Sequence, residues 1–453
     1  MARQASTRLA ASAQRFQARR LSHALVCREI SLDEEPLRAQ SRSLAVGGVL
    51  AAIAVAGCAV MAVVRPQGVP DSAPILLARE SGAMFVRVDD ALHPVPNLAS
   101  ARLIARTAAA PVVVAERSLT RLPRGPRLGI PGAPDAIGTP LAEPAWTVCD
   151  GERTIVLVGA SSPPYDSART VLVSPRGESA ATTYLLYDGV RARVDLRERA
   201  VARALHLDGV APVPVSRALL DALPELPAVT VPAIAGAGTT GPESVGGLPV
   251  GTVIRVARAD AEEFHVVLAD GLQRVGAVAA EVIRTAYRGA GDIATVSPAA
   301  VAASAAVDSL PVGGFPRSTR APVGAADEMT VCVHWDRGDT VVASGDSTHL
   351  DTTGATALAQ ADGDGPRVDA VAMPGGRSVY VRSVGASGAA AAGGPRFLVT
   401  ESGVLFGVAD DEAATALGLP TPGAAPWPIL AQLPAGPELA IAVASVPRDV
   451  PSA

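Results

Sequence analysis

The chain of 453 residues contains no lysine, so all 39 of its basic residues are arginines. This absence excludes two kinds of chemistry in their usual form. A P-loop needs a lysine to reach the β- and γ-phosphates of a nucleotide, and a Schiff-base enzyme needs a primary amine. Aromatic residues are also scarce, at 3% of the chain. The hydrophobic cores must therefore be built from Val, Leu, Ile and Ala.

Motifs of several other enzyme classes are missing from the sequence as well. The six histidines form no H-E-x-x-H motif, no G-x-S-x-G nucleophile elbow occurs, and no cysteines are paired at zinc-binding spacing. Residues 236–241 (GAGTTG) match the dinucleotide pattern G-x-G-x-x-G, but the following PESVGGLP cannot open the required helix. We expect a loop there. The sequence predicts no catalytic residue, no metal ligand and no cofactor site.

One long hydrophobic run is present. It begins at Leu44, ends at Val64 and contains 21 residues without a charge. A helix of this length spans roughly 31 Å, which is one bilayer crossing. Residues 55–58 (VAGC) resemble the lipobox of a lipoprotein, which would be cleaved before Cys58. Because 43 residues precede the run and uncharged residues continue after Cys58, a retained transmembrane helix is the favoured interpretation.

The charges on either side of this helix differ in sign. Residues 1–42 hold eight arginines and four acidic residues, whereas the 389 residues after Val64 hold 31 arginines and 40 acidic residues. The positive-inside rule predicts a cytoplasmic N-terminus, with the larger portion in the periplasm outside the inner membrane. A net charge of −9 on that portion argues against nucleic acid as a partner, because phosphate binding needs a basic surface.

Four cysteines divide among these compartments. Cys27 lies in the cytoplasmic arm and Cys58 in the membrane helix, so only Cys149 and Cys332 are exported. Two cysteines in an oxidising compartment favour one disulfide, and each lies in a short alternating run that predicts a β-strand. Two separate buried thiols are the alternative.

A recurring unit is found in the exported portion. Residues 77–90 (LARESGAMFVRVDD) align without gaps on residues 398–411 (LVTESGVLFGVADD), and weaker copies begin at Tyr184 and His265. Strand, Ser-Gly or Asp-Gly turn, and strand predict a β-hairpin. Helical segments follow at residues 97–105, 195–207, 277–286 and 410–419. Asp89–Asp90 and Asp410–Asp411 fall at repeated positions, where we expect both pairs to begin helices.

The predicted fold class is α+β. It comprises a helical cytoplasmic arm, one transmembrane helix, and an elongated periplasmic region of four hairpin-plus-helix repeats around a central β-rich core. Residues 170–174 and 378–383 are among the strands expected in that core. The expected segments are the arm (1–42), the transmembrane helix (43–64), the first repeat (65–120), the first core segment (121–181), the second repeat (182–230), the third repeat (250–296), the second core segment (300–390), the fourth repeat (395–440) and a C-terminal tail (441–453).

Several phrases, in this order around one membrane helix, resemble the EccB family of the type VII (ESX) secretion machinery. They are STRLAASAQRFQARRLSHALVCRE, PLRAQSRSLAVG, VRPQG, VRVDDALHPVPNLASARLIA, LGIPGAPDAIGTPL, WTVCDG and APWPILAQLPAGPEL. The resemblance implies a structural subunit of an inner-membrane secretion complex. It also implies four repeats, similar to the cell-wall-binding fold of certain phage lysins, around a core held by a Cys149–Cys332 disulfide.

The same resemblance implies partners and alternative functions. The expected partners are EccC, EccD, EccE and further EccB copies, docked on an arm that keeps Arg15, Phe16, Arg19, Arg20 and His23. The tail after Leu439 is shorter than in relatives. Some family members are described as ATPases, so ATP as a ligand is implied by resemblance only. Peptidoglycan binding is a third alternative.

Overall fold

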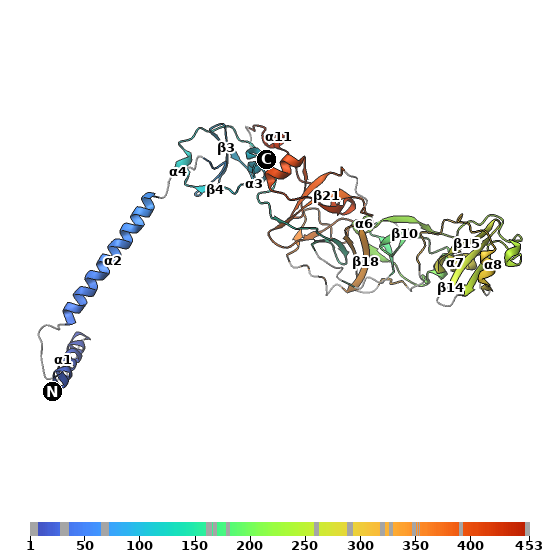
Figure 1. Ribbon diagram of the computed structural model, residues 1–453, viewed down its shortest axis with the longest axis horizontal. Coiled ribbons are helices and arrows are strands. Elements are labelled where there is room, and N and C mark those ends of the chain that lie inside the picture. Colours follow the sequence, from blue (N-terminus) through green and yellow to red (C-terminus); the bar gives the residue numbers. More distant parts are fainter. Residues whose placement is uncertain are drawn as a thin grey trace. The chain divides into compact units, whose positions relative to one another are not determined.

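The computed structural model divides the chain into two compact units, Met1–Gly68 and Val69–Ala453, and each is described by itself (Figure 1). The described residues are 8–27, 36–64, 72–159, 165, 170–177, 182–257, 262–287, 293–317, 322–325, 329–346, 350, 352, 354–388 and 393–448. The fold is mixed α+β, with helices in the first unit and several sheets in the second.

The first unit consists of two helices, α1 (Arg8–Cys27) and α2 (Pro36–Val64). Helix α1 contains no glycine, proline or acidic residue, so good helix formers and arginines run along its whole length. Helix α2 is apolar around its circumference over most of its length, and Ser41–Met61 is long and apolar enough to cross a membrane.

The first sheet of the second unit shows a topology that recurs. Strands β1 (Ile75–Ala78), β2 (Met84–Val88) and β3 (Ala91–Val95) form an antiparallel meander. Helix α3 (Leu98–Ala105) then leads to β4 (Val112–Val114), which pairs parallel to β1 at the other edge. The order is β3-β2-β1-β4.

Three further sheets contain the same meander, helix and parallel fourth strand. The second consists of β8 (Val171–Pro175), β9 (Thr183–Tyr187), β10 (Val190–Val194), α5 (Arg199–Ala204) and β11 (Val213–Val215), with β12 (Glu225–Val229) added beside β10. The third consists of β13 (Val253–Ala257), β14 (Glu262–Leu268), β15 (Gly271–Val275), α7 (Ala277–Tyr287) and β16 (Ala294–Val296). The fourth consists of β21 (Arg377–Val384), β22 (Arg396–Thr400), β23 (Leu405–Val408), α9 (Asp411–Leu417) and β24 (Gly423–Pro426).

The expected helix-start role is right for one Asp pair and wrong for the other. Asp410 caps α9, where its side chain accepts a hydrogen bond from the backbone N–H of Ala413 at 2.7 Å. Asp89 and Asp90 instead form the turn between β2 and β3, with φ values of 46° and 65°. Two successive positive φ angles are typical of a type I′ hairpin turn. The gapless alignment matches the first hairpin of one sheet to the second hairpin of another.

A fifth sheet is built from two distant stretches of the chain. Its order is β18-β17-β6-β7-β20-β19. The strands are β6 (Trp146–Asp150), β7 (Thr154–Val158), β17 (Met329–Asp336), β18 (Asp339–Asp346), β19 (Thr356–Ala357) and β20 (Ala370–Ala372). Residues 170–174 and 378–383, expected in this core, instead belong to β8 and β21 of the second and fourth sheets, because each pairs with the next strand of its own meander.

Helices join the hairpin sheets in pairs. Helix α3 packs against α9, and α5 packs against α7. The short helix α11 (Ile441–Ala444) also packs on α3, so the segment expected as a tail begins with ordered structure. The remaining short elements are α4 (Glu116–Leu119), β5 (Thr139–Pro140), α6 (Arg217–Asp221), the 3-10 helix η1 (Glu243–Val245), α8 (Pro298–Ala302) and α10 (Trp427–Leu430).

Candidate functional site

Helix α1 carries the residues expected to dock on partners. Arg15, Phe16, Arg19 and Arg20 are all exposed, and Phe16 keeps 47% of its surface accessible. His23 lies in the same helix, but its side chain is outside the described residues. Four arginines and no acid make α1 a positively charged surface with exposed apolar side chains.

Helix α2 carries the residues expected to anchor the chain. Leu44 lies inside the helix and Val64 is its last residue, while Cys58 is an exposed helical residue without a disulfide. Gly48, Ala52 and Ala56 recur every four residues, which would allow a second helix to approach closely. Every residue of the apolar stretch Ser41–Met61 is exposed in the first unit.

Cys149 and Cys332 are joined by a disulfide in the fifth sheet. They are directly opposite one another in the antiparallel pair β6–β17, and both are buried. Their Cα atoms are 4.1 Å apart, the short spacing of a pair without direct backbone hydrogen bonds. The bridge links positions separated by 183 residues in the sequence.

The neighbouring pairs of the same two strands are equally well buried. Trp146 faces Trp335 across the ladder, with 0% and 1% of their surfaces exposed. His334 faces Thr147, and His334 Nδ1 lies 2.8 Å from the Thr147 hydroxyl. Burial lowers the pKa of His334, although Asp336 partly opposes this shift. Burial thus favours the neutral form of the imidazole inside the sheet.

A buried ion pair lies at the end of β6. Arg176 Nη2 is 2.5 Å from Asp150 Oδ1 and donates to the carbonyl of Gly151. The backbone N–H of Ser216 also donates to Asp150. Burial raises the pKa of Asp150, with Arg176 acting in the opposite direction. Because β6 belongs to the fifth sheet while Arg176 follows β8, this pair ties the fifth sheet to the second.

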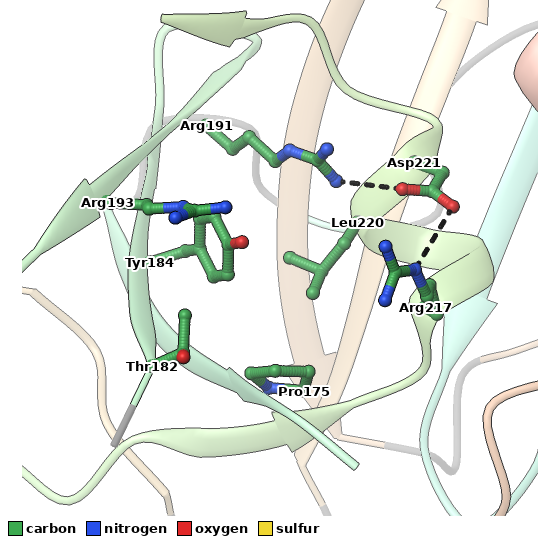
Figure 2. A pocket seen from close by; sticks show the side chains of 8 residues that line it. All are labelled: Pro175, Thr182, Tyr184, Arg191, Arg193, Arg217, Leu220 and Asp221. Carbon is green, nitrogen blue, oxygen red and sulfur yellow. Dashed lines mark hydrogen bonds and ion pairs between the residues drawn. The ribbon is translucent and has the colours of Figure 1, made fainter. Parts of the chain in front are cut away.

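Three arginines converge on a small cavity of about 120 Å³ over the second sheet (Figure 2). Arg191 and Arg193 extend from β10 over the ring of Tyr184, with guanidinium carbons 5.5 and 5.7 Å from its centroid. Arg217 comes from α6.

Carboxylates neutralise much of the charge in this cavity. Arg191 pairs with Asp221 at 3.2 Å and with Glu225 at 2.9 Å, and Arg217 pairs more loosely with Asp221. None of the sequence motifs predicts this cluster, although arginines at alternate positions of VRARV signal one strand face. The volume is below the roughly 300 Å³ at which small-molecule sites begin.

Two larger hollows lie on the second and third sheets. One of about 520 Å³ is lined by Arg203, His206, Asp208 and Glu281 around the α5–α7 contact, and one of about 310 Å³ lies beside β15. Within the described residues, no cluster of His, Cys, Asp or Glu could hold a metal ion. Residues 236–241 lie in turns that lead to η1, which is the loop expected from the sequence.

The comparisons with known proteins agree with this architecture. The family model described as "Type VII secretion system ESX-1, transport TM domain B" matches residues 3–452. The chain belongs to the EccB family. ESX-3 secretion system ATPase EccB3 of Mycolicibacterium smegmatis is 34% identical over 477 residues, with 98% of this chain and 91% of the relative covered. ESX-5 secretion system ATPase EccB5 of Mycobacterium tuberculosis is 32% identical, with 98% and 94% covered.

Solved structures of EccB relatives are similar over most of the chain. The "EccB3 dimer from the ESX-3 core complex" has a TM-score of 0.68 and 32% identity, with 82% of this chain and 100% of that chain covered. The "intact ESX-5 inner membrane complex" contains a chain with a TM-score of 0.68 and 30% identity, with coverage of 100% and 98%.

Removing the disulfide should destabilise the second unit. Because the bridge closes a loop of 183 residues, the double variant Cys149→Ala/Cys332→Ala should lose up to about 5 kcal/mol of unfolding free energy. Urea unfolding of residues 69–453 measures this loss. As a control, reductant should destabilise the wild type and leave the double variant unchanged. Equal stability of oxidised and reduced wild type would contradict the prediction.

Acidification should weaken the fifth sheet through His334. Its pKa is lowered from 6.5 in the folded state, so the unfolded chain takes up the proton first. Stability is therefore full above pH 6.5 and falls as the pH drops towards the lowered folded pKa. His334→Gln should flatten this region of the pH profile of unfolding free energy. Thr147→Val keeps the imidazole and should therefore keep the pH-dependent fall in unfolding free energy. If His334→Gln showed the same fall as the wild type, His334 would not be its cause.

Proposed function

We propose that the protein is a structural subunit of an inner-membrane type VII secretion complex. The observation that carries this proposal is the order of its segments: an arginine-rich helix, one membrane-length helix, and a disulfide-linked domain of five sheets. Relatives matched over nearly the whole chain are named as ESX secretion components, and one solved relative belongs to an ESX-5 inner membrane complex. The second unit then acts as a periplasmic scaffold of four repeats around the fifth sheet.

The proposed orientation has α1 in the cytoplasm and the second unit in the periplasm. The excess of arginine before α2 supports it, because positive residues remain on the cytoplasmic side. The disulfide supports it independently, because such bonds persist in oxidising compartments. Labelling of Cys27 in intact cells by a membrane-impermeant thiol reagent would contradict this orientation.

Helix α1 is the proposed docking element for other subunits, and the chain is proposed to associate with further copies of itself. The family resemblance suggests EccC, EccD and EccE as partners. The exposed arginines and Phe16 supply both charge and apolar surface for such contacts. Self-association is supported by the relative solved as an EccB3 dimer. Peptidoglycan binding rests on family resemblance alone.

Purification of the full-length protein in mild detergent tests this function. A motor ATPase and a many-pass membrane protein should co-purify with it. Recovery of this protein without any other subunit would count against the proposal. The triple variant Arg15→Gln/Arg19→Gln/Arg20→Gln should reduce this co-purification several-fold, because it removes most of the charge of α1. A matched control replaces three exposed arginines of the second unit: Arg121→Gln, Arg153→Gln and Arg367→Gln. If both variants lost co-purification of the other subunits equally, α1 would not be the docking surface.

ATP hydrolysis is the alternative function, because several relatives are named ATPases. The cavity beneath Arg191 and Arg193 is a place where arginines converge and could meet a phosphate. It is small, however, and carboxylates partly neutralise the charge of its arginines. We therefore expect residues 69–453 not to hydrolyse ATP. Any ATP turnover in early preparations should fall relative to the amount of this protein as purification proceeds. Proportional turnover that is lost in Arg191→Ala/Arg193→Ala, with folding intact, would establish the alternative.

A further inference from the structure

Strand β4 is an unusual edge in the second unit. Among the described residues of that unit, four large hydrophobic side chains are exposed: Val112, Val113, Trp427 and Val446. Two of the four are adjacent in β4, with 37% and 49% of their surfaces accessible. Successive residues of a strand face opposite sides of the sheet, so both faces of β4 are open at Val112 and Val113, while Val114, on the same face as Val112, is buried. Proteins usually protect edge strands with charge or cover.

The backbone of β4 also presents hydrogen-bonding groups outward. Its inner side pairs parallel to β1, and the N–H of Arg79 donates to the carbonyl of Val114 at 2.9 Å. Because backbone direction alternates along a strand, Val112 and Val114 face β1, and the N–H and C=O of Val113 face away from it. No strand pairs with that outer side among the described residues. Val113 therefore presents one donor and one acceptor at the sheet edge.

We propose that β4 pairs antiparallel with β4 of a second copy, about a two-fold axis that passes between the two Val113 residues. This inference rests on the proposed self-association of a membrane-anchored subunit and identifies the surface that performs it. Each Val113 then donates its N–H to the carbonyl of the other, and the two four-stranded sheets become one continuous sheet across the interface.

The residues around Val113 favour a second copy as the occupant. Two-fold pairing sets Val112 opposite the partner's Val114, and Pro111 opposite the partner's Ala115. No charged side chain faces another within this stretch, so the uncharged strand meets an equally uncharged one. Pro111 lacks an N–H, which limits the ladder and makes the contact weak in dilute solution. Anchoring of the copies by α2 in one membrane raises their effective concentration and compensates for this weakness.

Cysteine cross-linking of the full-length protein in membranes tests this arrangement. The background carries Cys27→Ser and Cys58→Ala, and the buried Cys149–Cys332 bridge is kept. In Val113→Cys the two new residues are directly opposite, with Cα atoms about 5.5 Å apart, which suits a disulfide. In Val112→Cys, the matched exposed control, the two residues lie diagonally, about 7–8 Å apart and outside bonding range. Mild oxidation should give at least tenfold more covalent dimer for Val113→Cys than for the control.

A second variant tests the same edge without a cross-link. Val113→Asp places two carboxylates opposite one another and should reduce co-purification of differently tagged copies several-fold. Retention of the Cys149–Cys332 bridge and co-purification of the other subunits verify that the variant is folded and assembled. Loss of those subunits from the wild type as well would indicate failure of the proposed function instead.

Three outcomes would overturn the inference. The first is equal cross-linking at Val112→Cys and Val113→Cys. The second is a Val113→Cys product that contains a different polypeptide, which would assign the edge to another partner. The third is the absence of a dimer although tagged copies still co-purify, which would leave self-association intact and place it on another surface.

Discussion

The pairing of β6 with β17 determines how the second unit is put together. Bringing together segments 183 residues apart costs loop-closure entropy, and the buried Trp146–Trp335 and Cys149–Cys332 pairs offset that cost in one short ladder. The second and third sheets lie entirely within the closed loop and bury their own core residues. The second unit is therefore an insertion of two sheets into a frame made by the first, fourth and fifth.

The four hairpin sheets share one way of packing with few aromatic residues. Each uses a helix rich in alanine, whose small side chains let helix and sheet, or helix and helix, approach closely. The α3–α9 contact illustrates this, because Ala99, Ala413 and Ala416 are all buried there. Arg102 closes the same contact by donating to the carbonyl of Leu417. Small aliphatic residues thus supply most of this core, alongside the buried rings of Tyr380 and Phe406.

Many of the strands and helices could be predicted from the sequence, because their positions depend on local signals. The strands around Cys149 and Cys332 follow from alternation. The helix near residues 97–105 follows from its polar cap Asn97, and the helix near residues 277–286 follows from apolar periodicity. The gapless alignment pairs hairpin β1–β2 of the first sheet with hairpin β22–β23 of the fourth, because a three-stranded meander contains two hairpins with similar turns. Asp89 and Asp90 can adopt positive φ, so their turn carries no glycine that would mark it.

Tertiary partnerships are less accessible from the sequence. Strands β8 and β21 look like core strands, and only their pairing with β9 and β22 assigns them elsewhere. The Asp150–Arg176 ion pair and the arginine cavity depend on backbone segments brought together by folding. No spacing rule predicts such partners, because the intervening segments differ in length and in structure.

The contact of α3 with α9 and α11 has a consequence for biogenesis. Arg102 and its acceptor Leu417 are separated by 315 residues, and the carbonyl of Ala444, near the chain's end, accepts from the N–H of Gly129. In the proposed orientation the chain after α2 crosses the membrane in sequence order, so α3 emerges first and the helices that cover it emerge last. In that orientation the first sheet would keep a bare apolar side until residues 411–444 have crossed, and a chain that ends earlier would leave that side open to chaperones and proteases.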